Sequence, residues 1–196
     1  MGCAMELLKQ KIRACGRALN EHVLLVDSFL NHQVDVKLMR EVGREFAARF
    51  ADAGVDRVAT IESSGIAPAA MTALELDAPL LILKKSVSSI LKDDVMQTEV
   101  FSFTKNAPYQ LTLKPQFVRP GERVLLIDDF LANGEAALGG ASLLERAGAQ
   151  VAGIGIVIAK TFQPGLAKLQ EAGYRVEILA PVRRMAEGVI EFEGEA

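Results

Sequence analysis

Two adjacent carboxylates, Asp128 and Asp129, follow the apolar run 124–127 and precede the small-residue segment 132–136. Paired carboxylates accept hydrogen bonds from vicinal hydroxyls, such as those of a ribose. Backbone N–H groups of a small-residue turn at the start of a helix bind a phosphate. An isolated Asp-Asp pair is more often a pair of surface acids, but the turn that follows a buried strand here favours a site for a phosphosugar. Neither common nucleotide-binding glycine motif is present.

A second polar turn, Glu62–Ser63–Ser64–Gly65, follows the apolar run 58–61. Two interpretations are open for it. The turn is either a second anion-binding nest or a plain strand-to-helix connection in which Ser63 or Ser64 caps the helix. Taken alone, the turn favours the plain connection, and only the presence of the first motif favours the nest.

The elements that must position these turns alternate between strands and helices. Apolar runs typical of strands buried on both faces lie at 58–61, 80–83, 124–127, 151–159 and 176–179. Helical spacing predicts helices at 5–15, 36–53 with Asp35 as N-cap, 66–76, from about 136, and 165–172. Glycines in the run 151–159 predict close backbone approach. This alternation predicts an α/β fold, a mainly parallel sheet flanked by helices, in a single domain over 1–196.

Three segments break this alternation. Residues 23–33 begin as an apolar run and continue without the period of a helix or a strand, which indicates an irregular element. Residues 84–110 read as an excursion off the sheet, a mobile loop or hairpin with strand-like alternation over 98–104. Residues 188–192 suggest a terminal β element.

Composition and charge argue against several function classes. Half of the 196 residues are apolar, the net charge is −3 and the sequence pI is about 5.5, so neither a nucleic-acid partner nor a membrane surface is expected. The chain has no apolar stretch near the ~20 residues of a membrane span. Two cysteines are too few for a disulfide framework or a zinc site, so a reducing cytoplasm is expected.

Taken together, these motifs resemble the type I phosphoribosyltransferase family over nearly the entire chain, and within it the bacterial enzymes that act on xanthine. The segments that carry the resemblance are 26–33, 61–68, 124–136 and 153–165. The resemblance implies that family's fold, with a small hood subdomain from the two chain ends, about 5–35 and 160–196, and a flexible catalytic loop at about 84–110. Residues 132–135 depart from the family's commoner Thr-Gly-Gly-Thr loop, so backbone N–H groups and Asn133 would replace hydroxyl donors.

The resemblance also implies roles for individual residues. Asp128 and Asp129 would hold the ribose hydroxyls and be catalytic. Phosphoribosyl pyrophosphate would be bound by Ala132, Asn133, Gly134, Glu135 and Ala136 at the 5′-phosphate and by Ser63, Ser64, Gly65 and Lys84 at the pyrophosphate. The Glu135 carboxylate has to point away from the phosphate. The purine would be bound by Leu24, Asn31, Lys160 and Phe162, with Phe162 stacking on the ring and Lys160 addressing the oxygen at position 6.

The implied activity is that of a purine salvage glycosyltransferase. It would transfer the phosphoribosyl group from phosphoribosyl pyrophosphate to xanthine, releasing pyrophosphate, in a cytoplasmic homodimer. Mg²⁺ would arrive bound to the substrate phosphates, since no dedicated metal-ligand cluster is visible. Hypoxanthine, guanine or adenine are alternative acceptors. A regulator that senses phosphoribosyl pyrophosphate and binds nucleic acid is a further alternative, against which the acidic balance and the lack of a helix-turn-helix segment before residue 20 argue.

Overall fold

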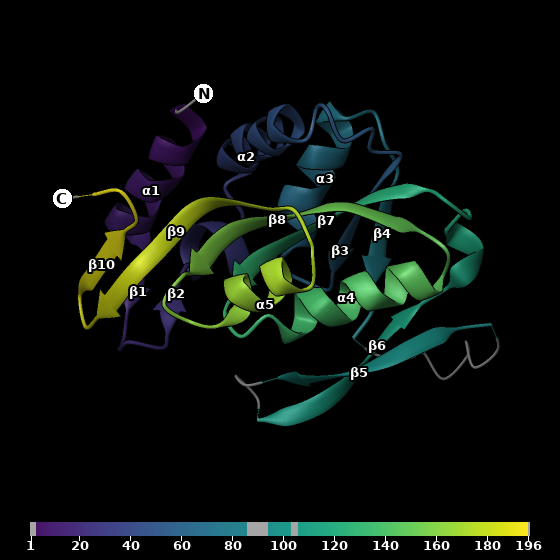
Figure 1. The fold of residues 1–196 in the computed structure, drawn as a ribbon. Helices are drawn as coiled ribbons and strands as arrows, with labels where there is room; N and C mark the ends of the chain where they lie inside the picture. Colours follow the sequence, from purple (N-terminus) through teal and green to yellow (C-terminus); the bar gives the residue numbers. More distant parts are fainter. Residues whose placement is uncertain (1–2, 86–93, 103–105, 196) are drawn as a thin grey trace.

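The computed structural model describes residues 3–85, 94–102 and 106–195. A six-stranded sheet in the order β10–β9–β8–β7–β3–β4 forms its centre (Figure 1). The strands run parallel except β10, which is antiparallel to β9. Their bounds are β3 Arg57–Ile61, β4 Leu80–Leu83, β7 Arg123–Leu131, β8 Gln150–Lys160, β9 Val176–Ala186 and β10 Val189–Phe192. The predicted α/β class with a mainly parallel sheet is confirmed.

Helices cover both faces of this sheet, as Figure 1 shows. The helices α2 (Val36–Arg49) and α3 (Ile66–Glu75) lie on one face, and α4 (Glu135–Arg146) and α5 (Gly165–Glu171) on the other. Along β7, Leu125 and Ile127 belong to the first core, whereas Leu126 belongs to the second. Successive side chains of a strand point to opposite faces, so a strand between two cores is an unbroken apolar run.

One sequence prediction about α2 is confirmed and one is corrected. Asp35 is its N-cap and accepts a hydrogen bond from the Leu38 N–H at 3.2 Å. A Cβ on Gly153 of β8 would overlap the Phe50 ring, which is the close approach that glycine permits. The helix ends at Arg49 rather than at residue 53, and Phe50 is its C-cap.

Strand β7 continues beyond the predicted end at Ile127, through both acids, to Leu131. Its neighbour β8 explains the extension, because Asp128 pairs with Ile156 and Phe130 with Ile158 in parallel register. Backbone pairing with β8 thus overrides the polarity of the two acids. The carboxylates belong to a strand rather than to the loop after it.

The excursion after β4 contains a hairpin, as the alternation predicts. Its strands β5 (Met96–Ser102) and β6 (Ala107–Leu113) are antiparallel, and a bridge between Lys84 and Thr112 ties β6 to the end of β4. The hairpin packs on α4, where a Cβ on Gly139 would overlap Val100. A short 3-10 helix (Pro115–Phe117) leads on to β7. The remaining parts of the expected loop, 86–93 and 103–105, lie outside the described residues.

The two ends of the chain lie together at one side of the sheet (Figure 1). Helix α1 (Cys3–Cys15) reaches the C-terminal segment through ion pairs of Lys9 and Arg13 with Glu195. The short strands β1 (Arg17–Ala18) and β2 (Leu24–Leu25) pair with each other, and the Gly188 N–H donates to the Ala18 carbonyl at 3.2 Å. A single π-helical turn (Asp27–Asn31) is the irregular element. Within the described ranges, no helix is long and apolar enough to cross a membrane.

Candidate active site

The two acids lie near the carboxyl end of β7, an interior strand between β3 and β8. Asp128 is only 7% exposed, and its Oδ1 accepts a hydrogen bond from the Asp129 N–H at 3.1 Å. Burial raises the pKa of Asp128 well above its ordinary value, and the charge of Asp129 raises it further. Burial likewise raises the pKa of Asp129. Such a pair, with Asp128 buried and Asp129 partly exposed, is suited to accept hydroxyl hydrogen bonds and to face a developing positive charge.

The turn at residues 63–65 lies directly against this pair. A Cβ on Gly65 would overlap the Thr60 hydroxyl and lie 3.2 Å from the Asp128 Oδ1. Gly65 itself is the N-cap of α3 and no side chain caps that helix, so the alternative of a serine cap is wrong. The peptide bond between Glu62 and Ser63 is cis. The structure therefore brings both sequence motifs into one site.

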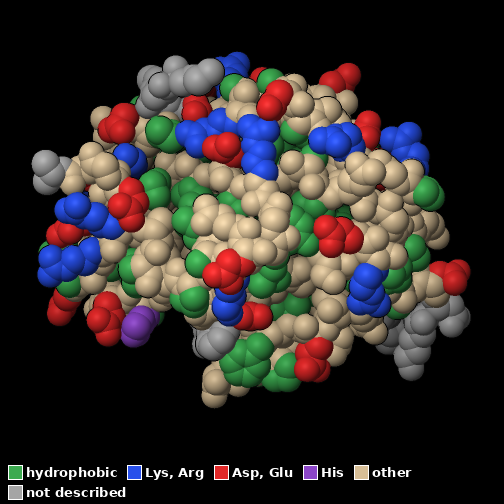
Figure 2. Space-filling view, in the orientation of Figure 1, with side chains coloured by type: hydrophobic (Ala, Val, Ile, Leu, Met, Phe, Trp, Pro, Cys, Tyr) green, Lys and Arg blue, Asp and Glu red, His purple; other side chains and the backbone are tan. Residues whose placement is uncertain are grey.

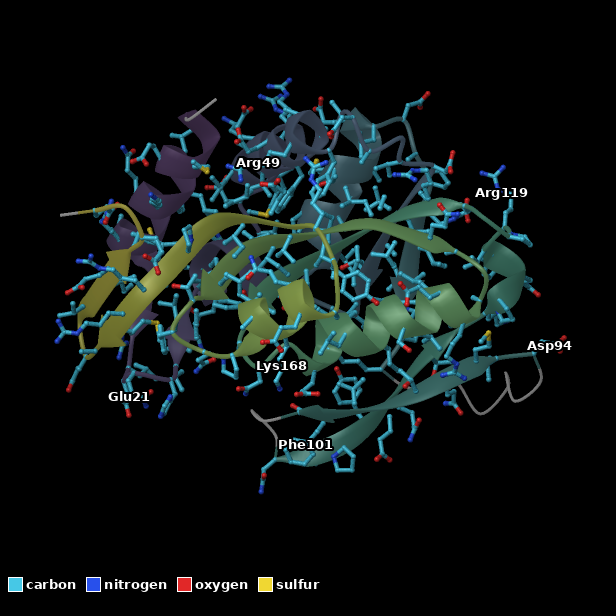
Figure 3. All side chains as sticks on the ribbon, viewed as in Figure 1. Glu21, Arg49, Asp94, Phe101, Arg119 and Lys168 are labelled. Atoms are coloured by element: carbon cyan, nitrogen blue, oxygen red, sulfur yellow. The ribbon has the colours of Figure 1, made fainter. Side chains whose placement is uncertain are left out.

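The segment after β7 surrounds a small cavity. Gly134 is the N-cap of α4 and has a left-handed backbone with φ 87°, a conformation that glycine adopts without strain. Helix α4 then starts at Glu135, and the N–H groups of its first turn have no partner within the helix. The cavity has a volume of about 140 Å³ and is lined by Phe101, Ser102, Asp128 and residues 130–137. Phe101 and Ser102 come from the hairpin, whose end Figure 3 shows below α5.

A distant turn supports this segment. The Gly165 N–H, at the start of α5, donates to the Ala132 carbonyl at 2.9 Å. A Cβ on Gly134 would lie 3.0 Å from the Gly165 Cα, and a Cβ on Gly165 would overlap the Ala132 carbonyl oxygen. Glycine at both positions lets the two backbones touch. The turn before α5 thus fixes the backbone shape of residues 132–134.

Two lysines at the end of β4 differ in their surroundings. Lys84 lies 3.4 Å from a Glu62 carboxylate oxygen. The charge of Lys85 lowers the pKa of both Asp128 and Asp129, in opposition to burial, and its ammonium lies 5.5 Å from the centre of the Tyr109 ring. Lys85 therefore acts electrostatically on the acid pair. The role expected for Lys84 at the pyrophosphate stays a prediction.

At the end of β8, Lys160 connects segments far apart in the sequence. Its ammonium donates to the His22 carbonyl and lies 5.8 Å from the centre of the Phe130 ring. Burial lowers the pKa of Lys160. Phe130 is a site residue that the sequence analysis missed, and its position two residues after Asp128, on the same face of β7, was the available signal.

The other three residues selected for a base-binding role differ in exposure. Phe162 follows β8 and is 43% exposed, whereas Leu24 on β2 is buried. Asn31 ends the π-helical turn and is exposed. Among the described residues, no hydrogen bond or ion pair joins the Asn31 side chain to Lys160 or to the two acids.

In the part of the chain that the structure describes, no group of three or more His, Cys, Asp and Glu side chains is arranged to hold a metal ion. The two carboxylates of Asp128 and Asp129 are oxygen donors of the kind that Mg²⁺ accepts when its other ligands are substrate phosphates and waters.

Comparisons with known proteins agree with this geometry. Residues 33–173 match the phosphoribosyl transferase domain family. The chain is 57% identical to a xanthine phosphoribosyltransferase of Exiguobacterium sp. over 96% of its own length and 97% of that protein. It is 53% identical to the protein of the same name from Clostridium acetobutylicum, over 96% and 100%.

Solved structures show the same fold. An adenine phosphoribosyltransferase from Rhodothermus marinus superposes with a TM-score of 0.73 at 25% identity, covering 91% of this chain and 98% of that one. The enzyme of this type from Giardia lamblia, solved with 9-deazaadenine, gives a TM-score of 0.75 at 20% identity, covering 88% and 96%. With its sheet, its paired acids and these similarities, the chain belongs to the type I phosphoribosyltransferase family.

Proposed function

We propose that the chain transfers the 5-phosphoribosyl group from phosphoribosyl pyrophosphate to xanthine, giving xanthosine 5′-monophosphate and pyrophosphate. The observation that carries the choice of xanthine is the identity of 50% or more, over nearly the full length, to relatives named xanthine phosphoribosyltransferase. The buried acid pair between two strand-to-helix turns supports the phosphoribosyl half of the reaction. The activity is one of purine salvage.

The donor is proposed to lie across the ends of β3, β7 and β4. Asp128 and Asp129 accept hydrogen bonds from the ribose hydroxyls. The 5′-phosphate binds in the loop formed by Ala132, Asn133, Gly134, Glu135 and Ala136, whose backbone N–H groups donate hydrogen bonds to it. The pyrophosphate takes the turn formed by Ser63, Ser64 and Gly65, with Lys84 and Lys85 supplying positive charge. Gly65 suits this role because its lack of a side chain keeps the turn against Asp128.

In the reaction, a purine ring nitrogen attacks the anomeric carbon while the bond to pyrophosphate breaks. The sugar passes through a state that resembles an oxocarbenium ion, as in other glycosyl transfers. The carboxylates of Asp128 and Asp129 are proposed to stabilise this positive charge. Alignment of base and sugar supplies much of the remaining rate. Mg²⁺, bound to the donor phosphates, would neutralise charge on the leaving pyrophosphate.

The purine is proposed to lie between Phe130 and Phe162, near Lys160. Phe162 keeps an exposed face to stack on a planar base. The Lys160 ammonium has three donors, so it can hold the His22 carbonyl and the oxygen at position 6 of the base together. Leu24 and Asn31 complete the proposed site from the N-terminal side. The chain ends around them would form the hood.

An assay of pyrophosphate release with xanthine, guanine, hypoxanthine and adenine, each offered separately, tests the proposal. We expect xanthine to give the highest kcat/KM, by about 100-fold over adenine, because a site that pairs with base oxygens penalises a base lacking them. Turnover of adenine alone, or of none of the four bases, would overturn the assignment.

The assembly and location are also proposals. The family resemblance implies a cytoplasmic homodimer, and analytical ultracentrifugation at several protein concentrations measures the mass directly.

Figure 2 shows basic and acidic side chains interspersed over the visible face. Such a mixed face, with a net charge of −3, gives no support to the alternative of a nucleic-acid-binding regulator.

A further inference from the structure

Glu135 is an unusual residue for a phosphate loop. It occupies the first turn of α4, within the segment proposed to bind the 5′-phosphate. A carboxylate there interacts well with the helix dipole, but it repels a phosphate dianion that approaches the same N–H groups. Something must hold this charge away from the phosphate.

The residue that holds it is Lys168. The Lys168 Nζ lies 2.6 Å from the Glu135 Oε1, and these two side chains join α5 to the start of α4. Figure 3 labels Lys168 on α5, beside the N-terminal end of α4. Lys168 is outside the cavity of about 140 Å³ that residues 130–137 line. Its connection to the cavity is the ion pair with Glu135, which does line it.

The backbone around this pair fixes its geometry. Gly165 lies three residues before Lys168 on α5, and the two share one face of that helix. Its N–H donates to the Ala132 carbonyl at 2.9 Å, and its Cα would lie 3.0 Å from a Cβ on Gly134. Helix α5 is thus held against the loop by main-chain contacts. These contacts place the lysine at the carboxylate without help from the ion pair.

Resting on the function proposed above, we propose that Lys168 is a positioning residue of the 5′-phosphate site. By pairing with Glu135 it turns that carboxylate toward α5 and neutralises it, so that the first turn of α4 can bind a dianion. This role explains how the loop Ala132–Asn133–Gly134–Glu135 works with an acid in its sequence. Lys168 itself does not touch the substrate.

The Glu135 and Lys168 side chains are exposed enough that substitutions there should not unfold the chain. The two side chains are 38% and 36% exposed, and ion pairs this exposed contribute little to stability. A matched control exists in Lys11 and Asp35, which lie 2.9 Å apart with side chains 34% and 31% exposed, on α1 and at the N-cap of α2. Lys168→Met and Lys11→Met therefore remove the same charge from equivalent pairs.

The test is calorimetric binding of ribose 5-phosphate, which carries the 5′-phosphate without base or pyrophosphate. We expect Lys168→Met to raise the Kd by about tenfold, the effect of about 1.4 kcal/mol of uncompensated repulsion. Lys168→Arg and Lys11→Met should stay within about twofold of wild type. Glu135→Gln combined with Lys168→Met should recover most of the loss. Added KCl should shrink the Lys168→Met effect, because salt screens exposed charges.

The outcomes separate the two proposals. If Lys168→Met binds as tightly as wild type, or if the double variant is as weak as Lys168→Met alone, the positioning role is overturned while xanthine turnover by the wild type still supports the function. If the wild type turns over no base but the ribose 5-phosphate series behaves as expected, the function falls and the role of Lys168 stands. A wild type that binds no ribose 5-phosphate overturns the positioning role, and the turnover assay with the four bases still decides the function.

Discussion

The two ends of the candidate site are built in different ways. The proposed phosphate end is built mainly from one stretch, Asp128 to Ala137, in which a strand, a glycine turn and a helix follow each other. The proposed base end is assembled from segments far apart in sequence, because the Lys160 ammonium meets the His22 carbonyl 138 residues away. The first end consists mainly of main-chain groups and the two acids, and the second consists of side chains.

This difference indicates which end tolerates change. A backbone nest depends on glycines and on the geometry of two strand ends, so most substitutions there disturb its shape. Stacking and side-chain hydrogen bonds at the base end are separate contacts, each of modest energy. Substitutions at the phosphate end should therefore abolish turnover, whereas those at the base end should shift KM for one substrate.

The largest effect is expected at the acid pair. Asp128→Asn combined with Asp129→Asn should lower kcat/KM by about 1,000-fold or more, because the groups that face the developing positive charge lose theirs. The fold should be retained, since each amide has nearly the shape of the acid. Steady-state kinetics and circular dichroism measure the two properties. Kinetics near wild type in this double variant would remove the acids from the site.

A second effect is expected where two backbones touch. Gly134 and Gly173 have nearly the same positive φ, 87° and 86°, but a Cβ on Gly134 lies 3.0 Å from the Gly165 Cα whereas one on Gly173 has open space. Gly134→Ala should lower kcat/KM by about 100-fold, the usual cost of a misplaced binding group. Gly173→Ala should lower the stability of the protein about as much as Gly134→Ala does, but leave its activity unchanged. Equal activity in the two variants would mean that the contact with Gly165 is unimportant.

At the base end the expected effect is smaller and selective. Phe162→Ala should raise KM for xanthine by about tenfold, through loss of one stacking contact, and change KM for phosphoribosyl pyrophosphate by less than about twofold. Phe117→Ala is the control, since Phe117 is 49% exposed on a short helix that the site does not use. A uniform rise in both KM values would point to a packing role for Phe162.

The smallest effect is on stability and depends on pH. Folding raises the pKa of Asp128, so the protonated form is favoured in the folded state. The stability that Asp128 contributes is fully present below its unfolded pKa, near 3.8, and is lost as the pH rises through its higher folded pKa. An asparagine at this position does not ionise, so Asp128→Asn should avoid that loss and raise the free energy of unfolding at neutral pH by about 1 kcal/mol. Urea titrations between pH 5 and 8 measure it, and parallel curves would contradict it.

The two ends also differed in what the sequence could predict. The acids, the glycine turn and the helix after it form a local pattern, so the phosphate end followed from neighbouring residues. The end of β7 did not, because pairing of Phe130 with Ile158 depends on a strand far along the chain. For the same reason the effect of Lys85 on the two acids could not be predicted from its neighbours in the sequence, since the acids lie on another strand.

The base end was predicted through the family resemblance and only in part through residue patterns. Phe162 and Lys160 end a clearly apolar strand, but nothing local shows that His22 lies beside Lys160. The π-helical turn Asp27–Asn31 has no period that distinguishes it from a loop. The role of Asn31 stays a prediction, since its placement depends on contacts that the base itself would make.

The pairing of the two chain ends affects the order in which the proposed donor and acceptor sites form during synthesis. Helix α1 and β1 are synthesised before the central sheet, but their partners, Gly188 and Glu195, are synthesised after it. The portion from β3 to α5, which includes the acids, the glycine turn, β8 and the Gly165 contact, can pack while synthesis continues, since domains fold as their elements appear. The half that would select the base is completed only after β10. A chain that stalls or is clipped after α5 would thus hold a donor site without a complete acceptor site.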